Sequence, residues 1–183
     1  MVRRLSDEVT KRDGKIISGL FIDGVALDRA SKRMNRKVSL ENLLNSFKRG
    51  HEIAIARYYT VIPQEDDSRH RSFLDAVAKA GFEVIVKRLP PKGVNRQVTS
   101  DLEMTTDMFA FACGSFAPDV TPSVIVVCPS HDLAYPFTAL KERGVITTAA
   151  DFGANRPGDV LKSAEDWIDL SDAEEIWIRR VIV

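Results

Sequence analysis

Short apolar runs alternate with amphipathic stretches along most of the chain. An apolar run between turn residues predicts a buried strand, and apolar residues three and four positions apart predict a helix. The predicted strands are 16–22, 52–62, 82–89, 123–128 and 145–149, and the predicted helices are 26–34, 39–50, 64–80, 100–113 and 133–143. This alternation is typical of a parallel sheet covered by helices on both faces. We therefore predict a three-layer α/β/α sandwich with a central, mainly parallel sheet.

The two ends of the chain carry other patterns. Residues 1–14 are polar and mixed in charge, which predicts a flexible arm before a single domain at 15–183. A short helix is expected at 160–168, and an apolar alternation at 176–183 predicts a last strand. Because an exposed sheet edge invites pairing with a second copy of the chain, a homodimer is one expected arrangement.

Length and composition exclude several classes of protein. The 183 residues include 26 basic and 26 acidic side chains, so a generally basic nucleic-acid coat is excluded. Two cysteines, Cys113 and Cys128, cannot make a disulfide framework or a four-cysteine zinc site. No apolar run approaches the length of a membrane span, and the charged first residues do not match a signal peptide. We expect a cytoplasmic protein without membrane contact.

Four aspartates interrupt apolar segments in a way that predicts a functional site. Asp23 ends the first predicted strand and Asp132 follows a later one, so both belong at the carboxyl edge of the sheet, where open α/β sheets bind ligands. Asp107 is the only charged residue in 104–118, within a helix that is apolar on nearly every side. Such a helix should be buried, and a buried carboxylate needs a cation or a paired side chain. Asp101 lies six positions earlier, at the start of the same helix.

A divalent metal ion accounts for these aspartates together. Oxygen ligands from separate strand and helix ends suit Mg²⁺ or Mn²⁺ rather than zinc. We predict Asp23, Asp107 and Asp132 as metal ligands, with Asp101 as an outer ligand or the base that orients a water molecule. The expected chemistry of these four catalytic candidates is phosphoryl transfer or phosphodiester hydrolysis.

Each of these acidic residues also has a purely structural interpretation. Asp23, before a glycine, could be a turn residue, and Asp101 could interact with the dipole of its helix. Asp132 could cap the helix that follows it. Glu103 could complete a capping box with the serine at the helix start. Asp107 could pair with a buried arginine or lysine instead of a metal ion.

Three motifs together resemble the NYN domain family, which includes LabA-like bacterial proteins and belongs to the PIN-like nucleases. The motifs are Phe21-Ile22-Asp23-Gly24, the segment 101–108 with aspartates at both Asp101 and Asp107, and the strand 124–128 followed by Pro129-Ser130-His131-Asp132-Leu133. The resemblance runs from about residue 16 to residue 170 and includes 160–170, which is similar to the family's closing helix. It implies a PIN-like fold, an acidic pocket for Mg²⁺ or Mn²⁺, and RNA as the substrate. The resemblance also matches Asp23, Asp101, Asp107 and Asp132 by position to the family's aspartates.

The chain departs from the family pattern at two positions. Ala26 stands where the family has asparagine, and Ser130 stands where it has aspartate. Loss of a carboxylate should weaken metal binding. The alternative to a metal-dependent endoribonuclease is therefore an NYN module with weak or no activity that binds RNA or a protein partner in regulation.

Basic side chains would hold RNA through its phosphates. The predicted substrate contacts are Ser130, His131, Lys92 and Arg96, and a second basic cluster comprises Arg29, Lys32, Arg33, Arg36 and Lys37.

A third hypothesis is a phosphatase of the haloacid dehalogenase class, because 21–25 is similar to that class's D-x-D-G-V loop. Phe21 occupies the position of the nucleophile, so the covalent mechanism has no attacking group. The sequence also contains no phosphate-binding loop of the G-x-x-x-x-G-K-[ST] or G-x-G-x-x-G type.

Overall fold

The computed structural model describes residues 2–4, 14–63, 68–90, 98–153 and 157–178. The strands are β1 (Val2–Arg4), β2 (Lys15–Asp23), β3 (Glu52–Ile62), β4 (Glu83–Arg88), β5 (Val120–Val127), β6 (Ile146–Asp151) and β7 (Asp166–Asp169). The α-helices are α1 (Gly24–Arg33), α2 (Leu40–Gly50), α3 (Ser68–Lys79), α4 (Asp101–Ala112), α5 (Ala134–Lys141) and α6 (Gly158–Ser163). Two 3₁₀ turns are η1 (His131–Leu133) and η3 (Glu174–Ile176).

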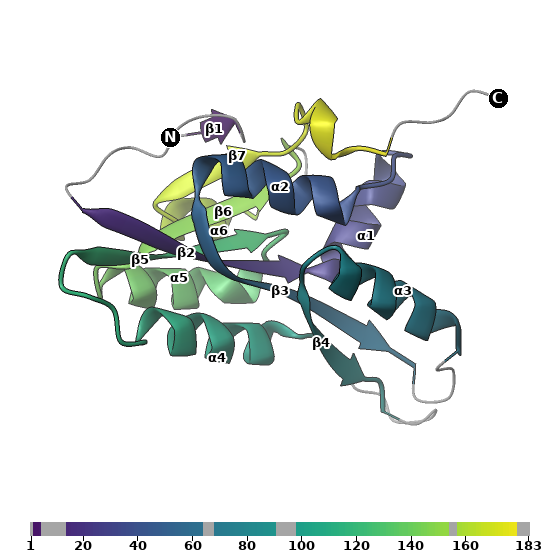
Figure 1. Cartoon of the computed structure of the whole chain (residues 1–183), viewed down its shortest axis with the longest axis horizontal. Coiled ribbons are helices and arrows are strands. Elements are labelled where there is room, and N and C mark those ends of the chain that lie inside the picture. The colour runs from purple at the N-terminus through teal and green to yellow at the C-terminus, as the bar shows by residue number, and fades with distance from the viewer. Residues whose placement is uncertain (1, 5–13, 64–67, 91–97, 154–156, 179–183) are drawn as a thin grey trace.

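All seven strands form one sheet in the order β1-β7-β6-β5-β2-β3-β4, and every neighbouring pair is parallel (Figure 1). Helices α1, α2 and α3 pack on one face, around Ile22 and Phe47. Helices α4, α5 and α6 pack on the other face, around Phe21, Met108 and Phe137. Because successive residues of a central strand are buried on opposite faces, the strand is apolar without interruption. The predicted three-layer α/β/α fold is confirmed.

The order of the strands creates a switch point between β2 and β5. From β2 the chain adds β3 and then β4 on one side of the sheet. Helix α4 then carries the chain back to β5, on the other side of β2, and β6 and β7 follow outward. Connections that leave two neighbouring strands in opposite directions open a crevice at the carboxyl ends of those strands, where ligands bind in open α/β sheets.

The strands and helices predicted between residues 16 and 149 are present, with ends that differ by a few residues. The closing helix predicted at 160–168 is wrong, because α6 ends at Ser163 and β7 follows it. Trp167 and Ile168 are both buried, since β7 lies between two other strands. A short apolar run covered on both sides cannot be assigned to helix or strand from its periodicity.

The two ends of the chain are described only in part. Within the predicted arm at 1–14, β1 pairs in parallel with β7, and residues 5–13 lie outside the described residues. The described part of the predicted strand at 176–183 makes a single antiparallel bridge, from Trp177 to Val38. The remainder of that segment, 179–183, lies outside the described residues.

Helix α4 is less buried than its composition predicts. Asp101, Met104 and Met108 are its buried residues, whereas Leu102 is 73% exposed. The helix therefore covers the sheet with one side only, and the prediction of burial all round is wrong. In the described part of the chain, no helix is long and apolar enough to cross a membrane.

Candidate functional site

Asp23 is the last residue of β2 and also begins α1. Its Oδ1 atom accepts a hydrogen bond of 2.9 Å from the backbone N–H of Ala26, which makes Asp23 the N-cap of α1. A cap satisfies one of the backbone donors that a helix start leaves without a partner. The side chain is half-buried at the switch point, so its carboxylate is fixed in direction at the edge where a ligand would bind.

Asp101 lies at the start of α4, at the same edge of the sheet. The residue is only 8% exposed, and no group in the described ranges hydrogen-bonds to its buried Oδ1 atom. The predicted capping box is wrong, because the Ser100 side chain makes no cap and Glu103 pairs instead with Lys87 (Nζ to Oε1, 2.8 Å). A buried carboxylate oxygen without a partner is unfavourable and indicates a site where a ligand supplies the missing interaction.

Asp23 and Asp101 interact through their charges. Burial raises the pKa of Asp23, the hydrogen bond from the Ala26 amide opposes that rise, and the negative charge of Asp101 raises the pKa further. Neighbouring carboxylates are a common arrangement in functional sites, because a bound cation relieves both their repulsion and the burial penalty.

Ser130 adds a third oxygen on the neighbouring strand connection. The chain turns directly after β5 at Cys128, whose backbone has a φ of 57° and whose N–H donates to Ala150 O at 2.8 Å. Left-handed backbone in a residue other than glycine marks a sharp change of direction. Two residues later, the Oγ atom of Ser130 is buried, and no described residue hydrogen-bonds to it.

The other residues predicted near this connection are exposed. Asp132 lies in η1 and does not cap α5, whose N-cap position is Leu133 without a side-chain hydrogen bond, so its predicted capping role is wrong. His131 is exposed, and its Nδ1 atom lies 3.9 Å from an oxygen of the equally exposed Asp159. Lys92 and Arg96 lie outside the described residues.

Asp107 is held by two residues of β3. Arg57 Nη1 lies 2.9 Å from one carboxylate oxygen, and the Tyr59 hydroxyl donates to the other at 2.7 Å. Arg57 also pairs with Glu83 on β4 at 2.7 Å, so this ion network ties α4 to two strands. Burial and the Asp107 contact both raise the pKa of Tyr59. Asp107 is therefore the partner of an arginine, which is one of the two interpretations of the sequence. Its role as a metal ligand stays a prediction.

The metal ligands predicted from the sequence thus have different surroundings. Asp23 interacts with Asp101. Asp107 forms an ion pair with Arg57, and Asp132 is exposed to solvent. Across the described residues, no group of three or more His, Cys, Asp or Glu side chains is arranged to hold a metal ion. What remains at this edge is the pair of carboxylates Asp23 and Asp101, and the buried Ser130 hydroxyl on the connection after the neighbouring strand.

Asp151 is a residue of this edge that sequence reasoning missed. It is the last residue of β6 and 4% exposed, and burial raises its pKa to about 6 despite hydrogen bonds from the Phe152 amide and the Cys128 thiol. The charge of Asp23 in turn acts on Cys128, so the three groups share one edge. The strand-end rule that selects Asp23 also selects Asp151, because that aspartate directly follows an apolar strand.

Comparison with known proteins agrees with the fold. The sequence model of the NYN domain matches residues 18–171, which is most of the chain. The chain is similar to the crystal structure of a protein of unknown function from Vibrio parahaemolyticus, with a TM-score of 0.73 and 16% identity over 93% of this chain and 100% of that chain. No curated protein matches. The chain belongs to the NYN domain family, within the PIN-like nuclease superfamily.

Proposed function

We propose that this protein is a divalent-metal-dependent endoribonuclease whose metal site is built on Asp23 and Asp101. The observation that carries the proposal is the buried Asp101 oxygen without a described partner, within electrostatic reach of Asp23. Burial and charge repulsion both disfavour two ionised carboxylates here, and a bound cation would compensate for both.

The residues at this edge fit a hard cation. Two carboxylates and the Ser130 hydroxyl provide oxygen donors, which Mg²⁺ and Mn²⁺ prefer. NYN nucleases generally depend on a divalent metal ion. When bound, such an ion neutralises charge on the scissile phosphate and lowers the pKa of a water molecule.

The side chains of the site would bind the ion, contact the phosphate and position one another. The cap on α1 fixes the direction of the Asp23 carboxylate, so that this carboxylate and the Asp101 oxygen without a described partner would hold the ion between them. The Ser130 hydroxyl can donate to a phosphate oxygen. Asp107 acts as a positioning residue, because its ion pair with Arg57 holds the helix that carries Asp101.

A cleavage assay tests the proposal. End-labelled single-stranded RNA is incubated with Mn²⁺ and wild-type protein, Asp101→Asn or Asp119→Asn. The control residue Asp119 is an exposed aspartate at the opposite, amino end of β5. We expect Asp101→Asn to reduce the rate by about 100-fold or more, since changes even around a metal ligand reduce activity by about 10–100-fold, and Asp119→Asn to cleave as the wild type does. Equal traces of cleavage by wild type and Asp101→Asn would refute the proposal.

A second candidate function is a module that binds RNA with weak or no hydrolysis. It is favoured by the pairing of Asp107 with Arg57 and by Ser130 in place of a family aspartate, which leave two carboxylates at the centre. Wild-type protein that binds the labelled RNA but does not cleave it with either Mg²⁺ or Mn²⁺ would support this candidate.

A further inference from the structure

The basic residues of α1 divide into two sets that face different surroundings. Helix α1 lies beyond the tip of β2, at the carboxyl edge of the sheet (Figure 1). Lys32 lies one turn after Asp28 and pairs with it at 2.6 Å. Arg29 and Arg33 also lie one turn apart, and the helical repeat places them about 100° further round the helix. Both arginines are exposed, and neither forms an ion pair with any residue that the structure describes.

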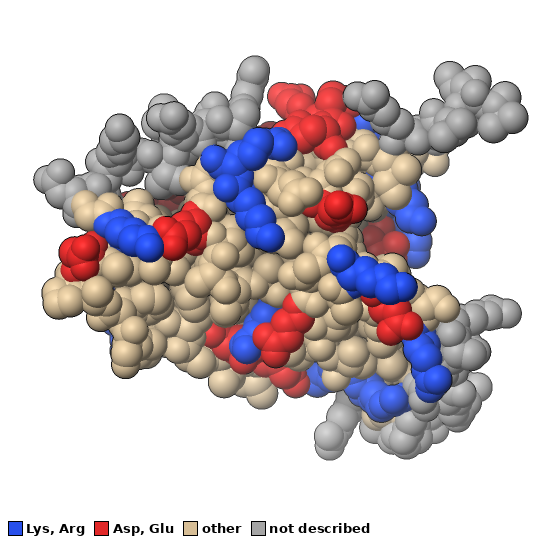
Figure 2. Space-filling view, viewed as in Figure 1, with Lys and Arg blue, Asp and Glu red and all other residues tan. Residues whose placement is uncertain are grey.

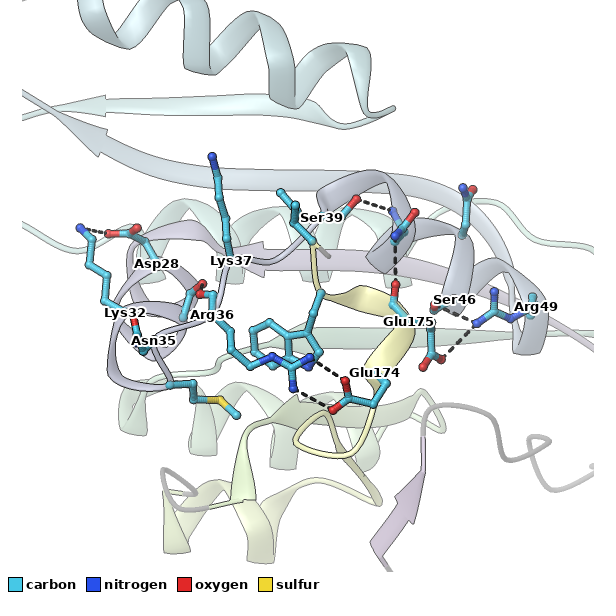
Figure 3. Close-up of a pocket in the computed structure, with 16 residues that line it drawn as sticks. Asp28, Lys32, Asn35, Arg36, Lys37, Ser39, Ser46, Arg49, Glu174 and Glu175 are labelled. Carbon is cyan, nitrogen blue, oxygen red and sulfur yellow. Dashed lines mark hydrogen bonds and ion pairs between the residues drawn. The ribbon is translucent and has the colours of Figure 1, made fainter. Parts of the chain in front are cut away.

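Three of the four basic residues that line the neighbouring groove are paired with carboxylates, namely Lys32, Arg36 and Arg49, whereas Lys37 forms no ion pair with any described residue. Figure 3 shows this groove between α1, α2 and the C-terminal segment. Arg36 forms two hydrogen bonds with Glu174, at 2.7 and 2.6 Å, and its guanidinium stacks over Trp177 at 4.4 Å. Arg49 pairs with Glu175 at 3.1 Å. A phosphate in this groove would have to displace these carboxylates, so the paired residues are poor candidates for holding RNA.

The unpaired arginines instead interact with the acidic edge. Burial raises the pKa of Asp23, Asp151 and Cys128, and the positive charges of Arg29 (on Asp23) and Arg33 (on Asp151 and Cys128) oppose that rise. Figure 2 shows basic side chains next to acidic ones at the end of the molecule where α1 lies. The carboxylate pair and the unpaired arginines therefore share one end of the molecule.

We propose that Arg29 and Arg33 bind consecutive phosphates of the RNA strand and direct that strand across Asp23. The identity of the ligand as RNA rests on the proposed function. An arginine binds a phosphate through two parallel hydrogen bonds, and two arginines one helical turn apart present two such groups on one side of a helix. Within the basic cluster, Arg29 and Arg33 would contact RNA, whereas Lys32 and Arg36 are held in ion pairs of the fold.

Phosphate contacts have a measurable dependence on salt. For single strands, each neutralised phosphate changes the slope of log K against log salt concentration by about 0.7. Loss of both arginine contacts should therefore reduce the slope by about 1.4, so that the ratio of wild-type to variant affinity falls by about sevenfold between about 50 and 200 mM salt.

The test compares two double variants that remove the same charge from different places. Arg29→Gln/Arg33→Gln removes the unpaired arginines, and Lys32→Gln/Arg49→Gln removes two exposed, ion-paired cations of the groove. Binding of a fluorescein-labelled single-stranded oligoribonucleotide is measured by fluorescence anisotropy in EDTA over a range of KCl concentrations. Circular dichroism verifies that both variants are folded.

We expect the arginine variant to lose affinity and salt dependence as calculated, and the groove variant to bind nearly as the wild type does. Equal weakening by both variants, unchanged binding by the arginine variant, or no binding by the wild type would overturn the inference. Because the assay contains no cleavage step, a protein that binds RNA through these arginines but never hydrolyses it would refute the nuclease proposal and leave this inference standing.

Discussion

Replacement of Asp151 with asparagine should stabilise the folded protein at neutral and alkaline pH. The carboxylate is 4% exposed, and burial raises its pKa from an ordinary value of 3.8 to about 6. A raised pKa means that the folded state binds the proton more tightly than the unfolded state. The stabilisation by this group is therefore complete below about pH 3.8 and is lost as the pH rises through about 6.

The size of the effect follows from the interval between the two pKa values. At 1.36 kcal/mol for each pH unit, the ionised Asp151 side chain costs the fold about 3 kcal/mol above pH 7. Asparagine removes this charge and keeps an oxygen that can accept the Phe152 N–H. For a protein of this length, 1 kcal/mol corresponds to about 2–4 °C, so Tm should rise by about 6–12 °C at pH 8.

Thermal unfolding followed by circular dichroism, in EDTA at pH 4, 6 and 8, measures this difference. The gain of Asp151→Asn over the wild type should be largest at pH 8 and nearly absent at pH 4. The control Asp119→Asn changes an exposed carboxylate and should leave Tm nearly unchanged. A gain of equal size at pH 4 and pH 8, or a lower Tm at pH 8, would refute the account of Asp151 as a buried, destabilising charge.

Three further substitutions test particular contacts. Asp23→Ala should cost about 1 kcal/mol through loss of the α1 cap, whereas Asp23→Ser should keep most of that stability and lose metal binding, as urea unfolding and Mn²⁺ titration would show. Tyr59→Phe should cost about 1 kcal/mol in urea unfolding, because it removes the hydrogen bond to the ion-paired carboxylate of α4. Gly24→Ala should cost more than about 1 kcal/mol in the same assay, because the added methyl group would overlap the ring of Tyr58. Gly158→Ala, also at the first position of a helix but with open space around it, should not destabilise the protein.

The sequence predicts the sheet edge better than it predicts the contacts at that edge. A charge at the end of an apolar run marks the carboxyl end of a strand, and this rule places Asp23 correctly and would have found Asp151. The rule depends on the local pattern alone, which the fold preserves because buried strands must be apolar.

The partners of Asp107 could not be predicted in the same way. Tyr59 lies 48 positions earlier in the chain, and Arg57 is on the same strand, so only the packing of α4 on β3 brings these side chains together. The partner of Glu103 could not be predicted either, because Lys87 lies on β4 rather than in the helix of Glu103. Spacing along the chain predicts contacts within an element, whereas contacts between elements depend on the sheet order.

The central claim is that Asp23 and Asp101 hold a divalent metal ion, and a Mn²⁺ titration tests it most directly. Electron paramagnetic resonance of free Mn²⁺ gives the affinity of wild-type protein, Asp101→Asn and the control Asp119→Asn. We predict that wild type and control bind with the same affinity and that Asp101→Asn binds at least about tenfold more weakly. Equal Mn²⁺ affinity in all three proteins, or no binding by the wild type, would contradict the account.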